Sequence, residues 1–212
     1  MNIILASDSL YTKSLLHKLG LTFQVDTTAI GVSTKKIKDV SDFVLDTAFK
    51  HAQNIYKKND QKNPKLVIAT FSAIQCGKKF FYKPQTAKEA LKMLKVLNNK
   101  EHTLFNALVL FSNNKIIYKQ VNKTIVKFKN ISNDVLNKYA ISEEALNNVG
   151  GYFIQGEGGM FIESIKGSYF NLVGMDLNSL IIALEKLQIK VEDSVKQTIK
   201  LQEKSIKESF PR

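Results

Sequence analysis

The sequence has a single cysteine, Cys76, and a single arginine, Arg212, among its 212 residues. One cysteine excludes an internal disulfide and fits a reducing compartment, so we expect a cytoplasmic protein. No apolar run approaches the roughly 20 residues that cross a bilayer, so membrane insertion is not expected. The apolar start from Ile3 to Ala6 is short and lacks a basic leader, and it predicts a first strand rather than a signal peptide.

Positive charge is abundant, but nearly all of it is lysine. Lys and Arg number 31 against 19 acidic residues, which gives a formal net charge of +12. Proteins that read bases depend on the planar, bidentate guanidinium of arginine, which this chain lacks outside Arg212. We therefore interpret the charge as a solvated lysine surface that attracts anions, nucleotides included, without specific nucleic-acid binding.

Strand and helix patterns alternate along the chain, and 44% of the residues are hydrophobic, which is enough for a core. This alternation predicts one α/β domain. We expect helices over 9–19, 40–56, 86–97, 132–139, 178–187 and 194–210. Strands are expected over 3–6, 23–25, 66–74, 80–82, 103–111, 116–128, 152–154 and 160–165.

Two short stretches offer groups that suit phosphate. Ser7 and Ser9 lie between a predicted strand and a predicted helix, where free N–H groups favour an anion. The alternative is that Ser9 simply caps the helix. Lys83, held before Pro84 at a strand end, could reach a phosphate as a point charge, although it could equally be one surface lysine among 30.

A third stretch, from Gly150 to Gly174, is rich in glycine, which indicates close backbone approaches or positive φ angles. Gln155 lies within it and can offer both a donor and an acceptor to the edge of a nucleobase. Glycine-rich turns can also be purely structural, so this stretch alone does not define a function.

Taken together and in this order, the three stretches resemble the Maf (septum-formation) family of nucleotide pyrophosphatases. That family's pattern has Ser-x-Ser-Pro-Arg-Arg, an apolar strand ending in Ala-Asp-Thr, Gly-Lys-Pro, Gly-Arg-Thr-His, and a long glycine-rich C-terminal motif. The resemblance spans Ile3 to about Leu187. The matching positions are Ser7, Ser9, Lys83, Pro84, His102, Gly150, Tyr152, Ile154, Gln155, Gly156, Phe161, Glu163, Gly167, Tyr169, Asn171 and Gly174.

The resemblance implies a fold and an activity. The fold is an elongated mixed sheet flanked by helices, with two lobes around a cleft, as in Maf and inosine triphosphatase proteins. The activity is hydrolysis of a nucleoside triphosphate, modified ones included, to a monophosphate and pyrophosphate with a divalent cation, Mg or Mn. Family members are often dimers, so a homodimer is an open expectation. Residues 1–187 would form this domain, and residues 188–212 would be a C-terminal amphipathic extension with no counterpart in the family.

Several positions depart from the family pattern where its chemistry is carried. Phe71 stands where the family has the Asp that acts as general base, and Ser72 replaces the neighbouring Thr while keeping a hydroxyl. Thr12 stands where an Arg would hold a phosphate, with Lys13 directly after it. Three further departures fall at Val32 for a Glu, at His51 for a Lys, and at Lys100-Glu101 for Arg-Thr.

These departures leave two functions open. By resemblance, Lys83 has a catalytic role, and the groups that bind substrate are Ser7, Ser9, Thr12, Ser72 and Gln155; no metal ligand is assigned. A phenyl ring can neither accept a proton nor bind a metal, and a general base contributes about 10²- to 10⁴-fold. The loss of two carboxylates also weakens cation binding, since hard cations prefer oxygen ligands. The alternative is an inactive Maf-like protein that binds a nucleotide or a protein partner.

Overall fold

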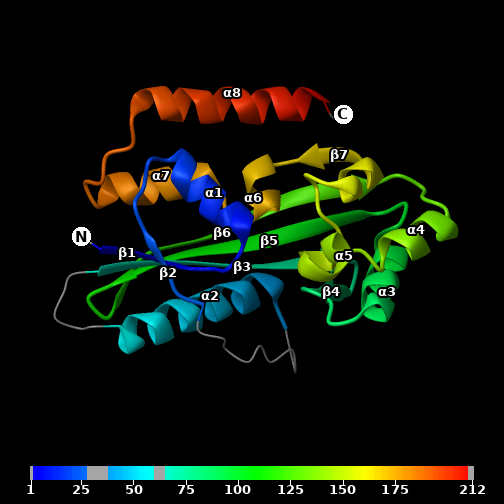
Figure 1. Ribbon diagram of the computed structural model, residues 1–212, viewed down its shortest axis with the longest axis horizontal. Coiled ribbons are helices and arrows are strands. Elements are labelled where there is room, and N and C mark those ends of the chain that lie inside the picture. Colours follow the sequence, from blue (N-terminus) through cyan, green and yellow to red (C-terminus); the bar gives the residue numbers. More distant parts are fainter. Residues whose placement is uncertain (1, 28–37, 60–64, 210–212) are drawn as a thin grey trace. The chain divides into compact units, whose positions relative to one another are not determined.

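The computed structural model describes residues 2–27, 38–59 and 65–209, and Figure 1 shows a mixed sheet with helices on both faces. Seven strands lie in the order β2-β1-β3-β5-β6-β7, with β4 paired to β3. β1 is parallel to β2 and β3, whereas β4 and β7 are antiparallel to their partners. The strands are β1 (Asn2–Ala6), β2 (Gln24–Val25), β3 (Lys65–Cys76), β4 (Lys79–Phe81), β5 (Glu101–Ser112), β6 (Lys115–Phe128) and β7 (Ile162–Lys166). The predicted α/β class with a mixed sheet flanked by helices is confirmed.

The helices follow the hydrophobic periodicity of the sequence closely. They are α1 (Leu10–Lys18), α2 (Val40–Lys58), α3 (Ala87–Leu97), α4 (Asn133–Tyr139), α5 (Glu143–Asn147), α6 (Tyr169–Val173), α7 (Leu177–Lys186) and α8 (Asp193–Ser209), with 3-10 turns η1 (Val149–Gly151) and η2 (Glu157–Phe161). Helix α3 is capped at its start, since the Thr86 hydroxyl oxygen accepts from Glu89 N and the Glu89 carboxylate accepts from Gln85 N, the residue before the cap. Within the described ranges, no helix combines the length and apolar character that a membrane crossing needs.

The chain divides into two compact units. Unit 1 contains residues 1–71, 106–122 and 174–202, and unit 2 contains residues 72–105, 123–173 and 203–212. Strands β3, β5 and β6 each contribute one part to each unit. The division of β3 falls between Phe71 and Ser72, so these two neighbouring positions belong to different units.

Unit 1 is built on β1 and the first half of β3, which are buried along nearly their whole length. Helix α2 covers one face of these strands, and α1 and α7 cover the other (Figure 1). Helix α2 buries Val44, Ala48, Ala52 and Ile55, a stripe at intervals of three and four residues. The helix expected over 40–56 is therefore present.

The core of unit 2 contains a cluster of aromatic rings. Phe128 stacks edge-on against both His102, at 4.9 Å, and Tyr152, at 4.8 Å between ring centroids. The His102 Nε2 atom lies 3.0 Å from the Tyr152 hydroxyl. Aromatic pairs of this kind contribute about 0.5–1.5 kcal/mol beyond burial of their surface. His102 and Tyr152 are both positions of the family pattern, and here they serve the core.

The expected strand over 152–154 is wrong, because that segment forms no strand pairing. The amide of Phe153 instead donates to the Tyr139 hydroxyl at 3.1 Å, so its acceptor is a side chain and not the backbone of a neighbouring strand. The short helices α5 and α6 were not expected either. Each has five residues, which is too short for a clear helical periodicity.

Buried His102 makes stability depend on pH. Burial lowers the pKa of His102 from 6.5 to about 4. In the unfolded chain His102 binds a proton below about pH 6.5, whereas in the folded protein it does so only below about pH 4. The free energy of unfolding therefore falls as the pH drops from about 6.5 to about 4. Urea denaturation at pH 7 and pH 5 measures the effect. We expect a smaller pH dependence in His102→Gln than in His17→Gln, which removes an exposed histidine; an equal dependence would contradict this assignment.

Candidate functional site

The first predicted stretch forms a turn that leads into α1 in unit 1. The Ser7 hydroxyl oxygen accepts from Ser9 N at 3.3 Å, and the Ser9 hydroxyl oxygen accepts from Thr12 N at 3.3 Å. Ser9 is therefore the N-cap of α1, as the structural alternative predicted. Both hydroxyls remain partly exposed at the positive end of a nine-residue helix, so capping does not exclude contact with an anion.

Thr12 has a different setting from the two serines. Its side chain is only 2% exposed, so a phosphate could reach it only after a rearrangement. A Cβ atom at Gly174 would lie 3.1 Å from the Thr12 hydroxyl oxygen, and Gly174 has a φ of +127° that favours glycine. Asn106 donates to the Gly174 carbonyl at 2.9 Å. The last glycine of the third stretch thus packs directly against the first stretch within unit 1.

Phe71, predicted to stand at the position of the family's general base, lies in an aromatic cluster with α2. Its ring is edge-on to Phe43 at 5.7 Å and to His51 at 6.0 Å between centroids. Phe71 and His51 are both departures from the family pattern, so two replaced positions contact each other. The His51 Nε2 atom is buried and has no hydrogen-bond partner among the described residues. Burial lowers the pKa of His51 from 6.5, so its ring is neutral at pH 7.

The side chains present do not form a ready metal site. In the part of the chain that the structure describes, no three His, Cys, Asp or Glu side chains come together as a metal would require. The position that would supply a carboxylate on β3 is the phenyl ring of Phe71, and Asp8 in the first turn is exposed. Val32, the other departure from an acidic residue, lies outside the described residues.

Unit 2 brings the second and third stretches together. Lys83 follows β4 and is exposed, while Pro84 beside it is buried. The amide of Gly150 donates to the carbonyl of Tyr82 at 3.2 Å, which joins the lysine–proline turn to the start of the glycine-rich segment. Ser72, the first residue of unit 2, is half-buried on β3.

The glycines around Gln155 are required by the protein's own side chains. A Cβ atom at Gly156 would lie 1.9 Å from a carboxylate oxygen of Glu144, and one at Gly158 would lie 2.5 Å from the Tyr139 hydroxyl. At Gly159 it would lie 2.4 Å from the Ile154 carbonyl oxygen. The close approaches predicted from the sequence are present, and their partners are residues of this chain.

The carboxylate of Glu144 on α5 holds this turn. It accepts from the Tyr139 hydroxyl at 3.1 Å and from the amides of Glu157, at 3.3 Å, and Gly158, at 3.4 Å. We call Glu144 and Tyr139 the glycine-turn clamp. Gln155, directly before the turn, is left exposed. No sequence signal identified the clamp, because its contacts connect residues 13 and 14 positions apart through tertiary structure.

The loop after β7 is fixed to β6 by polar side chains. Thr124 donates to the Ser168 carbonyl at 2.9 Å, and the fully buried Asn171 donates to the Thr124 hydroxyl oxygen at 3.0 Å. Tyr169 lies between Ser168 and Asn171 in this loop, and its side chain is buried. Burial raises the pKa of Tyr169, and Gln155 nearby lowers it to a smaller extent. Tyr169 and Asn171 of the family pattern thus belong to a loop that is held to β6.

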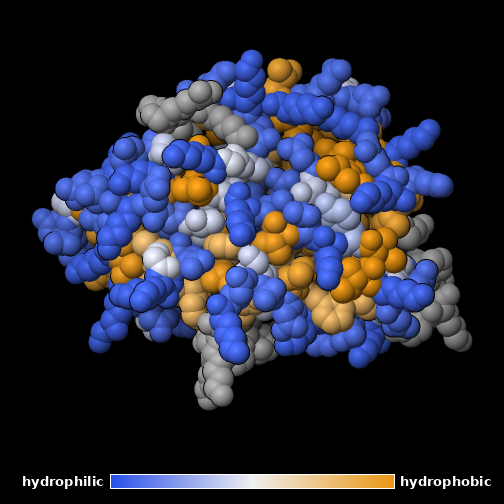
Figure 2. Space-filling model, turned by 180° about the vertical axis from the view of Figure 1, so that it is seen from behind, coloured by the Kyte–Doolittle hydropathy of each residue, from blue (hydrophilic) through white to orange (hydrophobic). Residues whose placement is uncertain are grey.

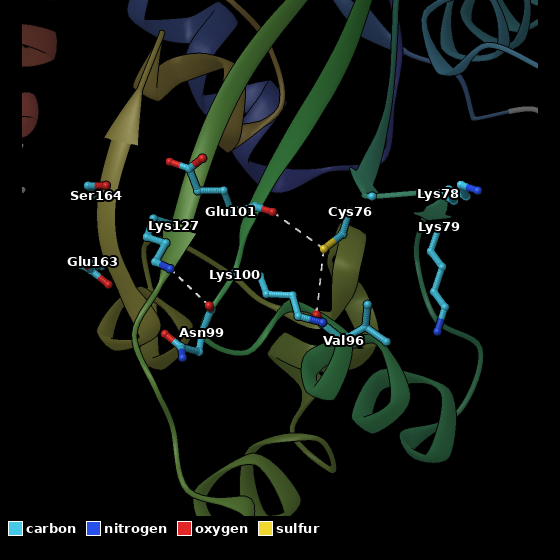
Figure 3. A pocket seen from close by; sticks show the side chains of 11 residues that line it. Cys76, Lys78, Lys79, Val96, Asn99, Lys100, Glu101, Lys127, Glu163 and Ser164 are labelled. Atoms are coloured by element: carbon cyan, nitrogen blue, oxygen red, sulfur yellow. Dashed lines mark hydrogen bonds between the residues drawn. The ribbon is translucent and has the colours of Figure 1, made fainter.

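A separate pocket of about 820 Å³ lies at the end of the β3–β4 hairpin in unit 2 (Figure 3). Four lysines and two glutamates line it, and the thiol of Cys76 lies 3.7 Å from the Glu101 carbonyl oxygen. Lys127 reaches across to donate to the Asn99 carbonyl at 3.1 Å. None of the residues predicted to bind substrate or to act in catalysis lines this pocket, although Glu163 and Lys100-Glu101 are positions of the family pattern.

Comparison with known proteins shows that the chain belongs to the Maf family, since the model described as Maf-like protein matches residues 2–187. The dTTP/UTP pyrophosphatase of Clostridium botulinum (strain Okra / Type B1) is 34% identical over 182 residues, covering 84% of this chain and 93% of the relative. The dTTP/UTP pyrophosphatase of Clostridium novyi (strain NT) is 35% identical, and the match covers 85% of this chain and 94% of the relative. That of Fusobacterium nucleatum is 30% identical over 190 residues, with coverages of 89% and 97%.

One solved structure, that of a HAM1 protein from Coxiella burnetii, matches 60% of this chain and 73% of its own length. The TM-score is 0.39 at 15% identity. A likeness this weak adds nothing to the family assignment, which rests on the sequence matches.

The contacts of Gly158 predict the effect of a single methyl group. Gly158→Ala would place a carbon 2.7 Å from the Phe153 amide nitrogen, so the backbone has to move. We expect the free energy of unfolding to fall by about 1–3 kcal/mol. Gly77→Ala is the control, because nothing lies within 4 Å of its added carbon and only its φ of +58° is unfavourable. Urea denaturation compares them. A smaller loss for Gly158→Ala than for the control would show that the turn is not tightly packed.

Proposed function

We propose that this protein hydrolyses a nucleoside triphosphate to the monophosphate and pyrophosphate, with dTTP and UTP as its preferred substrate class. Membership of the Maf family supports the reaction, and the dTTP/UTP pyrophosphatases that this chain matches over 93–97% of their length support the nucleotides. Water oxygen forms a bond to the α-phosphorus, the bond to the bridging α–β oxygen breaks, and the proton of the water passes to solvent.

The observation that carries the proposal is the survival of the binding groups. Ser7 and Ser9 present hydroxyls at the N-terminus of α1 and are assigned to phosphate oxygens. Lys83 is exposed, and its positive charge is assigned to the phosphates of the nucleotide. The Ser72 hydroxyl is assigned to the triphosphate as well. Gln155, which is exposed, is assigned to the nucleobase edge. Thr12 is assigned to packing under the turn, since its side chain is buried.

Catalysis in this proposal rests on positioning and charge rather than on a side-chain base. Phe71 cannot accept the proton of the attacking water, and His51 beside it is packed against that ring. In-line positioning and neutralisation of the phosphate charge can still accelerate the reaction. We expect turnover to be slower by about 10²- to 10⁴-fold than with a carboxylate at this position.

A second candidate is a protein that binds the nucleotide without turning it over. The contact between Phe71, Phe43 and His51 favours it, because an apolar cluster occupies the place where the family activates water.

Pyrophosphate release from UTP and dTTP, measured with Mg or Mn, distinguishes the two candidates. We expect slow release by the wild-type protein and at least about tenfold less by Lys83→Ala, which loses a charge on the phosphates. Lys92→Ala, on the exposed side of α3, is the matched control. If the wild type and Lys83→Ala release pyrophosphate at the same background rate while the wild type binds UTP, the second candidate holds.

Placing a carboxylate at position 71 tests what the missing base costs. Phe71→Asp is expected to raise the rate by about 10²- to 10⁴-fold if a base is all that is lacking. Phe71→Asn is the control. Its side chain is as large as that of Phe71→Asp and loses the same ring contacts with Phe43 and His51, but an amide cannot accept the proton of the water. Equal rates in the two variants would show that the site lacks more than its base.

Four further expectations accompany this proposal: a homodimer, a cytoplasmic location, a link to septum formation and no specific binding of nucleic acid. Figure 2 shows hydrophobic residues interrupted by hydrophilic side chains on the face that it draws. Exposed large apolar residues such as Leu10, Ile141 and Leu201 come from different elements. All four expectations stay predictions from composition and family.

A further inference from the structure

Strand β6 has an open edge over its first half. It lies between β5 and β7 in the sheet, and its pairing with β7 covers residues from Ile125 to Phe128. Among the described residues, no strand pairs with the other side of Lys115–Val121, which we call the open edge. The open edge lies within unit 1, and most of its side chains are exposed. An exposed strand edge presents N–H and C=O groups that can pair with another strand.

The backbone of this edge is within reach of groups outside the sheet. The Val121 carbonyl accepts from the side-chain amide of Gln120 at 3.3 Å in an exposed bond. Further along β6, the chain itself adds an antiparallel strand, β7. The open edge therefore offers the same kind of backbone that β7 already pairs with at the other end of the strand.

Helix α7 contacts one face of β6 and leaves the other face to solvent. The Lys186 Nζ atom lies 5.4 Å from the centroid of the Tyr118 ring, and Asn122 donates to the Ser179 hydroxyl oxygen at 2.9 Å. Side chains alternate between the two faces of a strand, so Tyr118 and Asn122 share the face toward α7. Lys119 lies on the opposite face and is exposed.

The charge of β6 is of one sign. Lysine recurs at every fourth position from Lys115 to Lys127, which places these positions on one face of a strand. No acidic residue occurs between Glu101 and Asp134. A second copy paired antiparallel about Lys119 would meet lysine with lysine, and like charges directly opposite are destabilising. The lysines thus disfavour this self-pairing, and the same charge attracts an acidic strand.

We propose that the open edge binds an extended acidic segment of a partner protein by strand addition. The backbone of that segment pairs with Lys115–Val121 and continues the sheet beyond β6. Acidic side chains of the segment lie opposite Lys115 and Lys119, and an apolar side chain between them lies against Ile117, which is 39% exposed. None of the residues assigned to the nucleotide belongs to the open edge, so the proposal is independent of the proposed function.

A synthetic peptide of the sequence Glu-Thr-Val-Thr-Glu-Thr-Val-Thr-Glu is the probe, because its Glu and Val side chains share one face. A second peptide has Lys in place of each Glu, and a third has the original side chains but N-methylated backbone amides, which cannot donate. Fluorescence anisotropy measures binding to the full-length protein. Hydrogen exchange follows the backbone amides of Lys115–Val121. The protein variant is Lys119→Glu, and Lys92→Glu, on the exposed side of α3, is its control with the same net charge.

We expect the acidic peptide to bind and to slow exchange of the amides in Lys115–Val121. Lys119→Glu weakens binding by about tenfold, since an attractive pair becomes a repulsive one, and Lys92→Glu leaves it unchanged. The Lys-containing and N-methylated peptides do not bind.

Three results would overturn the proposal. The first is that the acidic peptide does not bind the wild-type protein. The second is equal binding of the N-methylated peptide, or equal weakening by Lys92→Glu, which would mean that the lysine surface attracts the peptide without strand addition. The third is exchange in Lys115–Val121 that slows with rising protein concentration in the absence of peptide, because the occupant of the edge is then a second copy of the chain.

Discussion

Strand β3 is buried along most of its length, and both units are built on it. Successive side chains of a strand point to opposite faces, so the residue at position 71 must face α2 whatever its chemistry. In this chain it meets Phe43 and His51, and its ring packs edge-on against each of them. The aromatic cluster therefore couples the position of the family's base to that of a residue on α2. A change at one of them alters the environment of the other, and this constrains what chemistry the protein can perform.

The binding side of the site is organised independently of that cluster. In unit 2, Glu144 and Tyr139 hold the glycine turn, and Thr124 and Asn171 hold the loop that carries Tyr169. These bonds join residues of the chain itself, so the backbone around Gln155 is held by its own side chains. In the proposed site, groups held in this way lower the cost of binding, because less side-chain freedom is lost when the ligand docks. The proposed site therefore combines held binding groups with a position for water activation that lacks an acid–base group.

Much of the fold could be predicted from the sequence, because local physics determines it. Helices α2 and α3 and strands β5 and β6 were all expected; Asn113 and Asn114, between the two strands, adopt positive φ angles of 49° and 57°. The loss of the base at Phe71 was equally visible, since no acidic residue occurs nearby on that strand. The roles of Glu144 and of Glu203, whose carboxylate accepts from Tyr169 N, could not be predicted, because each depends on a partner brought close only by tertiary folding. For the same reason the glycines indicated close approaches of the backbone but not which residues it approaches.

The central claim is that the Maf nucleotide site persists although Phe71 replaces its base. The most direct test is a crystal structure of the protein with the α,β-imido analogue of UTP, which cannot be cleaved at the α–β bridge. We predict phosphates contacted by Ser9 and Lys83, and the base at Gln155. Density for the analogue in the lysine-lined pocket beside Cys76, with Ser9, Lys83 and Gln155 free of it, would contradict the account.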